Sequence, residues 1–123
     1  MFVNFANLSN FTNSIIEQTA NASLQTKVLD IGPWDMNSVV NVDVAHGLAD
    51  ISKIRSYEIL IIDDNQDYVK KFDAYELVTN AGVAAIDSVN VSMVVLGASS
   101  FATNAIYSGT SINRGTITIQ YEA

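Results

Sequence analysis

The side chains that could perform acid–base or metal chemistry are few in this chain, and their spacing does not complete a catalytic motif. There is one histidine, His46, so a metal site with two histidines cannot form. There is no cysteine, which excludes disulfides, thiolate zinc sites and cysteine nucleophiles. Serine and aspartate are abundant, but no Gly-x-Ser-x-Gly elbow surrounds a nucleophile. The sequence therefore favours a chain that is not an enzyme and uses no cofactor.

His46 lies where an expected strand stops. Val42 and Val44 alternate with Asp43, and this period of two predicts a strand with one face turned inward. Gly47 follows the histidine, and glycine allows a turn that other residues resist. His46 is therefore expected to hydrogen-bond a turn or to lie at a subunit contact, and a catalytic role is disfavoured.

One stretch has the beginning of a calcium-binding pattern. Asp63, Asn65 and Asp67 match the first three ligand positions of a calcium loop. The match then fails, because Tyr68 stands where the loop requires glycine and Ala74 where it requires a bidentate glutamate. A solvated turn at a hairpin tip is favoured over a metal site. The positions of the acidic residues in the sequence also do not set the distance between two carboxylates, which a glycosidase active site requires.

The bulk composition limits the partners. The chain has 123 residues, which is enough for one domain with a modest core. Nearly half of the residues are apolar and only 15% are charged, which suggests that copies of the chain cover part of one another's surface. The net charge is −7 and the six basic residues form no stripe, so nucleic-acid binding is not expected.

The sequence shows no targeting or spanning segment. The first residues lack the basic and continuous apolar regions of a signal peptide. No run approaches the roughly 20 apolar residues that span a bilayer. A complete product made in a cytoplasm, without membrane association, is the expectation.

From residue 26 onward the apolar period is two, and turn residues recur every eight to twelve positions. The apolar runs at 59–62 and 89–96 suggest strands buried on both faces. The segment 97–109 looks like a loop anchored by Phe101, Ile106 and Tyr107. The fold class predicted is all-β, an antiparallel, jelly-roll-like β-sandwich over residues 26–123. Its expected strands cover residues 26–31, 37–45, 56–62, 68–75 (with Phe72 inward), 83–86, 89–96 and 116–121.

Trp34 follows the Gly32-Pro33 break after the first expected strand. It could close one end of the sandwich as part of the core, or it could be an exposed platform on which a sugar stacks. Large aromatic side chains dominate burial in a small β core, so the core position is favoured.

Residues 1–25 form a separate leader, rich in asparagine, serine and threonine. Its apolar residues recur at helical spacing, although these polar residue types are poor helix formers. The leader could assemble or anchor the protein, or it could lie on the core of its own chain. The residues assigned to anchoring are Phe2, Phe5, Leu8, Phe11 and Ile15.

Four short stretches follow one another in a recognisable order: I-G-P-W-D-M at 31–36, V-D-V-A-H-G-L at 42–48, I-R at 54–55 and N-R-G-T-I-T-I-Q-Y at 113–121. Together they resemble the β-structured terminal module of tail fibres and head fibres of tailed bacteriophages. The resemblance covers about residues 27–121. One departure is Thr116, where members with this motif carry tryptophan after Asn-Arg-Gly.

This resemblance implies a non-enzymatic structural protein of a virion that is assembled in the host cytoplasm. The implied assembly is a homotrimer, attached to the capsid or to other virion proteins through residues 1–25, as a head fibre. The alternative is the tip of a tail fibre that binds a receptor or a host surface glycan. His46, Arg114 and Trp34 are assigned to the trimer interface or to the ordering of turns.

Overall fold

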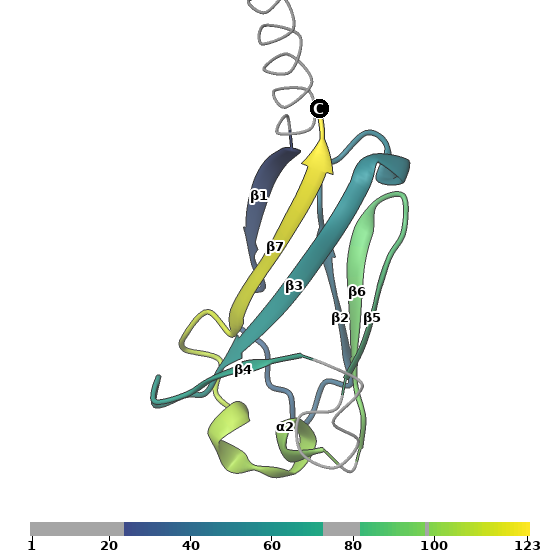
Figure 1. Cartoon of the computed structure of the whole chain (residues 1–123). Helices are drawn as coiled ribbons and strands as arrows, with labels where there is room; N and C mark the ends of the chain where they lie inside the picture. Colours follow the sequence, from purple (N-terminus) through teal and green to yellow (C-terminus); the bar gives the residue numbers. More distant parts are fainter. Residues whose placement is uncertain (1–23, 73–81, 98) are drawn as a thin grey trace, which may run out of the picture.

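A computed structural model describes residues 24–72, 82–97 and 99–123, which form two antiparallel β-sheets (Figure 1). Sheet A has the strand order β1-β7-β3-β4, and sheet B has the order β2-β6-β5. The predicted all-β sandwich is thereby confirmed. The strands are β1 (Leu24–Asp30), β2 (Asn41–Ala45), β3 (Ile54–Ile62), β4 (Val69–Lys71), β5 (Gly82–Ile86), β6 (Asn90–Val95) and β7 (Gly115–Glu122).

The core lies between the two sheets because each strand turns alternate residues inward. In β3, Ile59 and Ile61 are buried, whereas Leu60 and Ile62, which alternate with them, are only half-buried. The expectation of a strand buried on both faces was therefore wrong, and β6 shows the same alternation. A sandwich of two sheets covers only one face of each sheet, so a continuous apolar run still presents every second residue outward.

The second strand begins later than predicted. The predicted start was residue 37, but β2 starts at Asn41. The reason is a turn at Asp35, whose carboxylate accepts hydrogen bonds from the backbone N–H groups of Asn37 at 3.0 Å and Ser38 at 3.2 Å. Aspartate commonly closes such turns with its own side chain.

The hairpin expected over residues 68–75 is shorter in the structure. β4 covers Val69–Lys71 and lies at the edge of sheet A, paired with β3. Phe72 is buried, as predicted, and its ring contacts those of Trp34 and Phe101 at centroid distances of 6.1 and 5.8 Å. Residues 73–75 lie outside the described residues.

The segment expected to be a loop holds two short helices, α2 (Ser100–Thr103) and η2 (Ala105–Tyr107); a third, η1 (Ile51–Lys53), precedes β3. Phe101 and Tyr107 are buried, as predicted, whereas Ile106 is half-buried. No helix among the described residues is long and apolar enough to cross a membrane.

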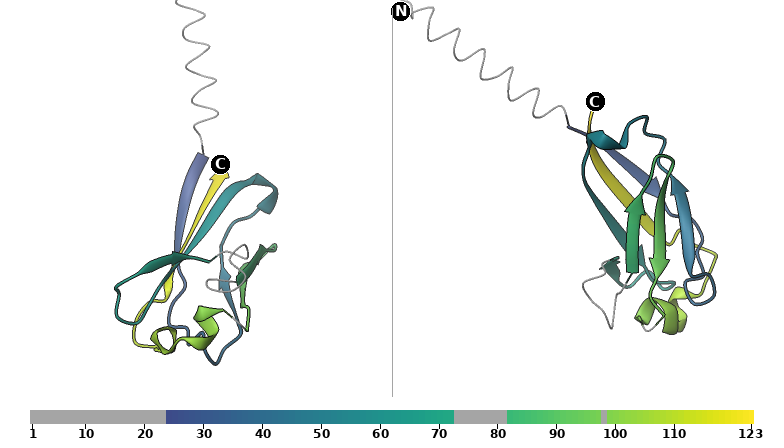
Figure 2. Two further views of the ribbon diagram at one scale, coloured as in Figure 1. Left: turned by 60° about the horizontal axis from the view of Figure 1, so that its bottom comes forward. Right: turned by 90° about the vertical axis from the view of Figure 1, so that its right-hand side faces the viewer.

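The sandwich has two distinct ends. Leu24 lies opposite Glu122, so the described chain enters and leaves sheet A at the same end, which we name the proximal end. Helix α2 lies at the opposite, distal end, together with the turns that follow β1 and β3 (Figures 1 and 2). This polarity determines which residues could attach the domain and which could meet a partner.

Candidate functional site

Arg114 precedes β7 at the distal end, is completely buried and binds four acceptors. Its Nε donates to the Trp34 carbonyl at 3.0 Å, and its Nη1 donates to the Ile62 carbonyl at 2.8 Å. Its Nη2 donates to the Gly109 carbonyl and to the Asp64 carboxylate, both at 2.6 Å. A planar guanidinium can serve acceptors in several fixed directions, which a lysine ammonium cannot. We name this set the arginine junction.

The backbone of Arg114 belongs to the same junction. Its N–H donates to the Gly32 carbonyl at 2.9 Å, and its carbonyl accepts from the Ile62 N–H at 2.7 Å. Gly32 in turn donates its N–H to the side chain of Asn113 at 2.7 Å. The junction therefore ties the segment after β1, the end of β3 and the loop before β7 to one another.

Asp64 is the anionic partner that the sequence did not reveal. Its carboxylate forms the ion pair with Arg114 and also accepts the Gly109 N–H at 2.9 Å. Its own N–H donates to the Ile106 carbonyl at 2.7 Å. Its side chain is 28% exposed, so water still reaches the pair. Fifty residues separate the two charges, and no local spacing connects them.

Tyr107 covers one side of the arginine junction. The centre of the guanidinium lies 5.9 Å from the centroid of its ring, within the range of a cation–π contact. Its hydroxyl is buried and has no hydrogen-bond partner in the described part of the chain. Burial, and secondarily the negative charge of Asp63, raise the pKa of Tyr107 above its ordinary value.

Trp34 occupies the core position that the sequence favoured. It is 2% exposed, and its Nε1 donates to the Val39 carbonyl at 2.8 Å. A ring covered in this way offers no face on which a sugar could stack, so the alternative of a glycan platform at Trp34 was wrong.

His46 orders the turn after β2, which is one of its two predicted roles. Its Nδ1 accepts the backbone N–H of Leu48 at 2.9 Å, so this nitrogen carries no proton. The proton therefore lies on Nε2, which is 2.8 Å from the Asp87 carbonyl and donates to it. The ring is 1% exposed and links the end of β2 to the turn between β5 and β6. Both nitrogens are used, which leaves neither for proton transfer.

The three residues assigned to a trimer interface or to turns, His46, Arg114 and Trp34, all lie inside a single chain. Each side chain is at most 2% exposed. Such side chains have no surface to present to a second copy. They therefore order turns within the chain and do not contact a second copy. These three residues of the motifs that produced the resemblance thus belong to the scaffold of the domain.

The calcium candidate is a closed turn. The Oδ1 of Asp63 accepts the N–H groups of Asp67 at 3.0 Å and Tyr68 at 2.8 Å, and Asp63 is 1% exposed. Its partners, Asn65 and Asp67, are exposed on the outside of the turn. Among the described residues, no three His, Cys, Asp or Glu side chains are grouped to hold a metal ion.

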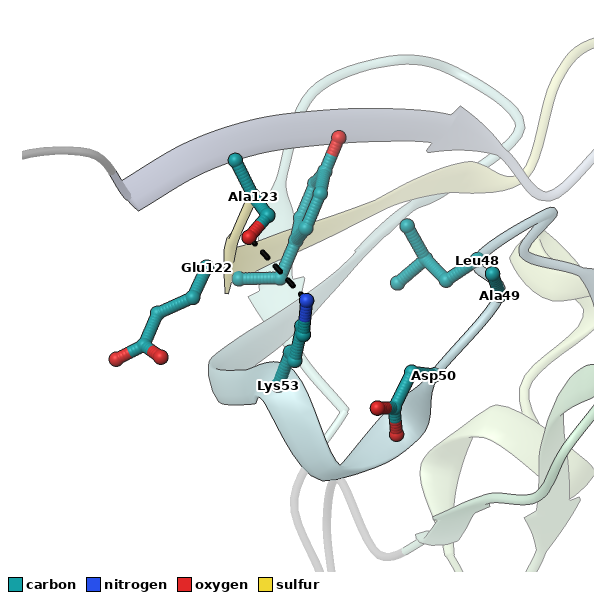
Figure 3. Close-up of a pocket in the computed structure, with 7 residues that line it drawn as sticks. Leu48, Ala49, Asp50, Lys53, Glu122 and Ala123 are labelled. Atoms are coloured by element: carbon teal, nitrogen blue, oxygen red, sulfur yellow. Dashed lines mark hydrogen bonds between the residues drawn. The ribbon is translucent and has the colours of Figure 1, made fainter.

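A pocket of about 160 Å³ opens at the proximal end, between η1 and the end of β7 (Figure 3). Its ionisable groups are already engaged within the chain. Lys53 donates to the Ala123 carbonyl at 3.3 Å, and Glu122 pairs with Arg55 at 2.8 Å. Hydrogen bonds from Ser52 hold the pKa of Asp50 below its ordinary value. The pocket presents no acid–base pair directed at a common point.

The leader residues Phe2, Phe5, Leu8, Phe11 and Ile15 lie outside the described residues. Comparison of the chain with known protein families, with curated proteins and with solved structures finds no match. A proposal of function therefore rests on the residues and the geometry described above.

Proposed function

We propose that this chain is a non-enzymatic structural protein of a bacteriophage virion, a homotrimeric fibre or knob attached through its N-terminal segment. The observation that carries the proposal is the difference between the proximal and the distal end of the sandwich. The described chain starts at Leu24 and ends at Ala123 at the proximal end, whereas α2, η2 and the turns that follow β1 and β3 lie at the distal end (Figure 1). A domain attached at one end and free at the other has the geometry of a fibre tip.

The arginine junction gives a physical reason for the motifs that resemble fibre proteins. The stretches 31–36 and 113–121 are 80 residues apart along the chain, yet Arg114 binds the carbonyls of Gly32 and Trp34. Their order in the sequence thus corresponds to one structural unit at the distal end. This supports a shared domain type, and the domain type supports the virion role.

The experiment that tests the proposal is the mass of the full chain in solution, measured by light scattering. We expect three times 13.3 kDa. A monomer at every concentration would contradict the fibre. Immunogold labelling of virions that carry the protein then distinguishes attachment at the head from attachment at the tail.

A second candidate, a tip that binds a receptor or glycan, is favoured by one observation. The loops 63–67 and 99–107 lie together at the distal end, since Asp64 donates its N–H to the Ile106 carbonyl. Tyr68, next to the first loop, is 62% exposed and offers an aromatic surface. Binding of the full chain to a glycan array, lost in Tyr68→Ala, would support this candidate. If the chain binds no glycan on the array, only the structural role remains.

A further inference from the structure

The outer face of sheet B is almost free of charge. Eight residues of its three strands point away from the core, and they form rows across the sheet. Val83 lies beside Val94, which lies beside Asn41; Ala85 lies beside Ser92, which lies beside Asp43. Ala45 and Asn90 complete the set. The right-hand view of Figure 2 looks onto these strands in front of sheet A.

The apolar residues on this face are exposed. Val83 and Val94 are 46% and 38% exposed, and Ala85 and Ala45 are exposed as well. The one charged residue, Asp43, lies in β2, two strands away from Ala85, or about 10 Å at the strand spacing of a sheet. The centre of the face, on β5 and β6, therefore has small apolar side chains and no charge.

The outer face of sheet A is different. It carries ion pairs between Lys71 and Glu58 at 3.5 Å and between Arg55 and Glu122 at 2.8 Å. Its exposed valines, Val28 and Val69, lie on the two edge strands. Charged side chains are depleted at the centre of protein interfaces and common on free surface. Leu60 and Ile62 also point outward from sheet A, but the two ion pairs give this face more charge than the outer face of sheet B.

The net charge restricts where two copies of the chain could meet. Each copy carries a net charge of −7, so two copies repel one another wherever carboxylates meet. The centre of this face, on β5 and β6, carries no carboxylate, and a contact there removes exposed valine and alanine from water. We propose that the outer face of sheet B, centred on Val83, Ala85 and Val94, is the surface through which copies of this chain contact one another. This inference rests on the homotrimer proposed above.

The direction of the strands fits that assembly. Sheet B runs from the proximal to the distal end, so copies that meet on this face around an axis parallel to the strands keep their proximal ends together (Figure 1). The 23 residues that precede Leu24 then leave every copy at the same end. A common attachment at that end requires this arrangement.

The test compares two doubly substituted full chains with the same change of charge. Val83→Asp with Val94→Asp places two carboxylates at the centre of the face. Val28→Asp with Val69→Asp places two on the outer face of sheet A, at valines that are each 60% exposed. We expect light scattering to give 13.3 kDa for the first chain and three times that mass for the second and for the wild type. Circular dichroism confirms that each chain is folded.

The outcomes separate the two proposals. A Val83/Val94 variant that keeps the mass of the trimer would overturn the assignment of the face and leave the fibre proposal standing. Dissociation of both variants would also overturn it, because the effect would not be specific to sheet B. A wild type that is monomeric at every concentration would overturn the homotrimer and, with it, this contact.

A second measurement needs no disruptive substitution. The chain has no cysteine, so Ala85→Cys provides its sole thiol at the centre of the face, and Val28→Cys provides a matched thiol on sheet A. In the assembled protein we expect a maleimide to modify Cys at position 85 at least about tenfold more slowly than at position 28, since buried contacts exclude reagent and water. Equal rates in a chain of trimer mass would contradict the proposal.

Discussion

Single residues at the distal end of the sandwich have roles set by burial and by hydrogen-bonding geometry. Arg114 satisfies four acceptors from three separate segments, and its ionic partner Asp64 keeps access to water. Tyr107 packs against the guanidinium, and its hydroxyl has no hydrogen-bond partner among residues 24–72, 82–97 and 99–123. Arg114 stabilises the fold through its hydrogen bonds, whereas the buried hydroxyl of Tyr107 lowers the stability of the fold.

Replacing Arg114 should destabilise the domain strongly. We expect Arg114→Ala to lower the free energy of unfolding by about 3–5 kcal/mol, because it leaves buried carbonyls without donors. Arg114→Lys should still lose about 2 kcal/mol, since an ammonium cannot reach all four acceptors. Urea unfolding of the full chain measures both.

The matched control is Arg55→Ala. Arg55 and Glu122 form an ion pair whose side chains are 45% and 47% exposed. An exposed pair of this kind contributes at most about 1 kcal/mol. Equal losses for Arg114→Ala and Arg55→Ala would show that the arginine junction does not hold the distal end together.

Tyr107→Phe should leave stability unchanged or raise it by up to about 1 kcal/mol at neutral pH, because it removes a buried hydroxyl that the described residues leave without a hydrogen bond. The difference should grow in alkali. Burial raises the pKa of Tyr107, so the folded chain keeps its proton while the unfolded chain ionises near the ordinary pKa of about 10. The stability linked to this proton is present below that value and is lost as the pH rises through the raised pKa.

Urea unfolding of wild type and Tyr107→Phe at about pH 8 and about pH 11 tests this, since these values lie on either side of the ordinary tyrosine pKa. The phenylalanine variant should lose less stability between the two. A variant that is clearly less stable than wild type at pH 8 would mean that the hydroxyl does have a partner.

At the scale of the elements, the pairing of β3 with β7 joins the middle of sheet A. Ile61 lies opposite Gly115, the first residue of β7. A β-carbon built on Gly115 would collide with the backbone carbonyl of Leu60. This glycine is needed because two backbones approach closely there, and no side chain could move aside to make room.

Gly115→Ala should therefore cost about 3 kcal/mol or more, at or above the usual range for overpacking. Gly97→Ala is the control, because a β-carbon on Gly97 would meet no atom of the described residues within 4 Å. Thermal unfolding followed by circular dichroism measures both. A Gly115→Ala chain as stable as Gly97→Ala would mean that β3 and β7 can separate without loss.

For the whole molecule, the net charge and the two outer faces bear on the homotrimer that we propose. Sheet A presents ion pairs to water, whereas sheet B presents an almost uncharged face. Copies with a charge of −7 repel at long range, and the proposed apolar contact would act only at short range. Salt should therefore weaken the repulsion between copies and leave the strength of the apolar contact unchanged.

We expect the homotrimer to become tighter as salt rises from about 0.01 M to about 1 M, because the screening length falls from about 30 Å to about 3 Å. Sedimentation equilibrium of the full chain at both salt concentrations measures the change. Weaker association in high salt would indicate that ion pairs hold the copies together, which would argue against a contact through sheet B.

The sequence by itself determined the local features. The period of two predicted the strands and the all-β class, Gly47 predicted the turn after β2, and the size of Trp34 predicted its burial. These features depend on neighbouring residues, so spacing along the chain reveals them. These patterns failed after Asp35, because its side chain closes a turn where a strand was predicted.

Only the tertiary structure decided which distant residues meet. Arg114 binds residues 80 and 50 positions away, and the pairing of strands places Val83, Val94 and Asn41 in one row. Alternation in the sequence shows that such residues face outward, but the identity of their neighbours follows from strand order and register. Contacts between distant segments form when the sheets pack, and for that reason the arginine junction and the uncharged face of sheet B could not be predicted from spacing alone.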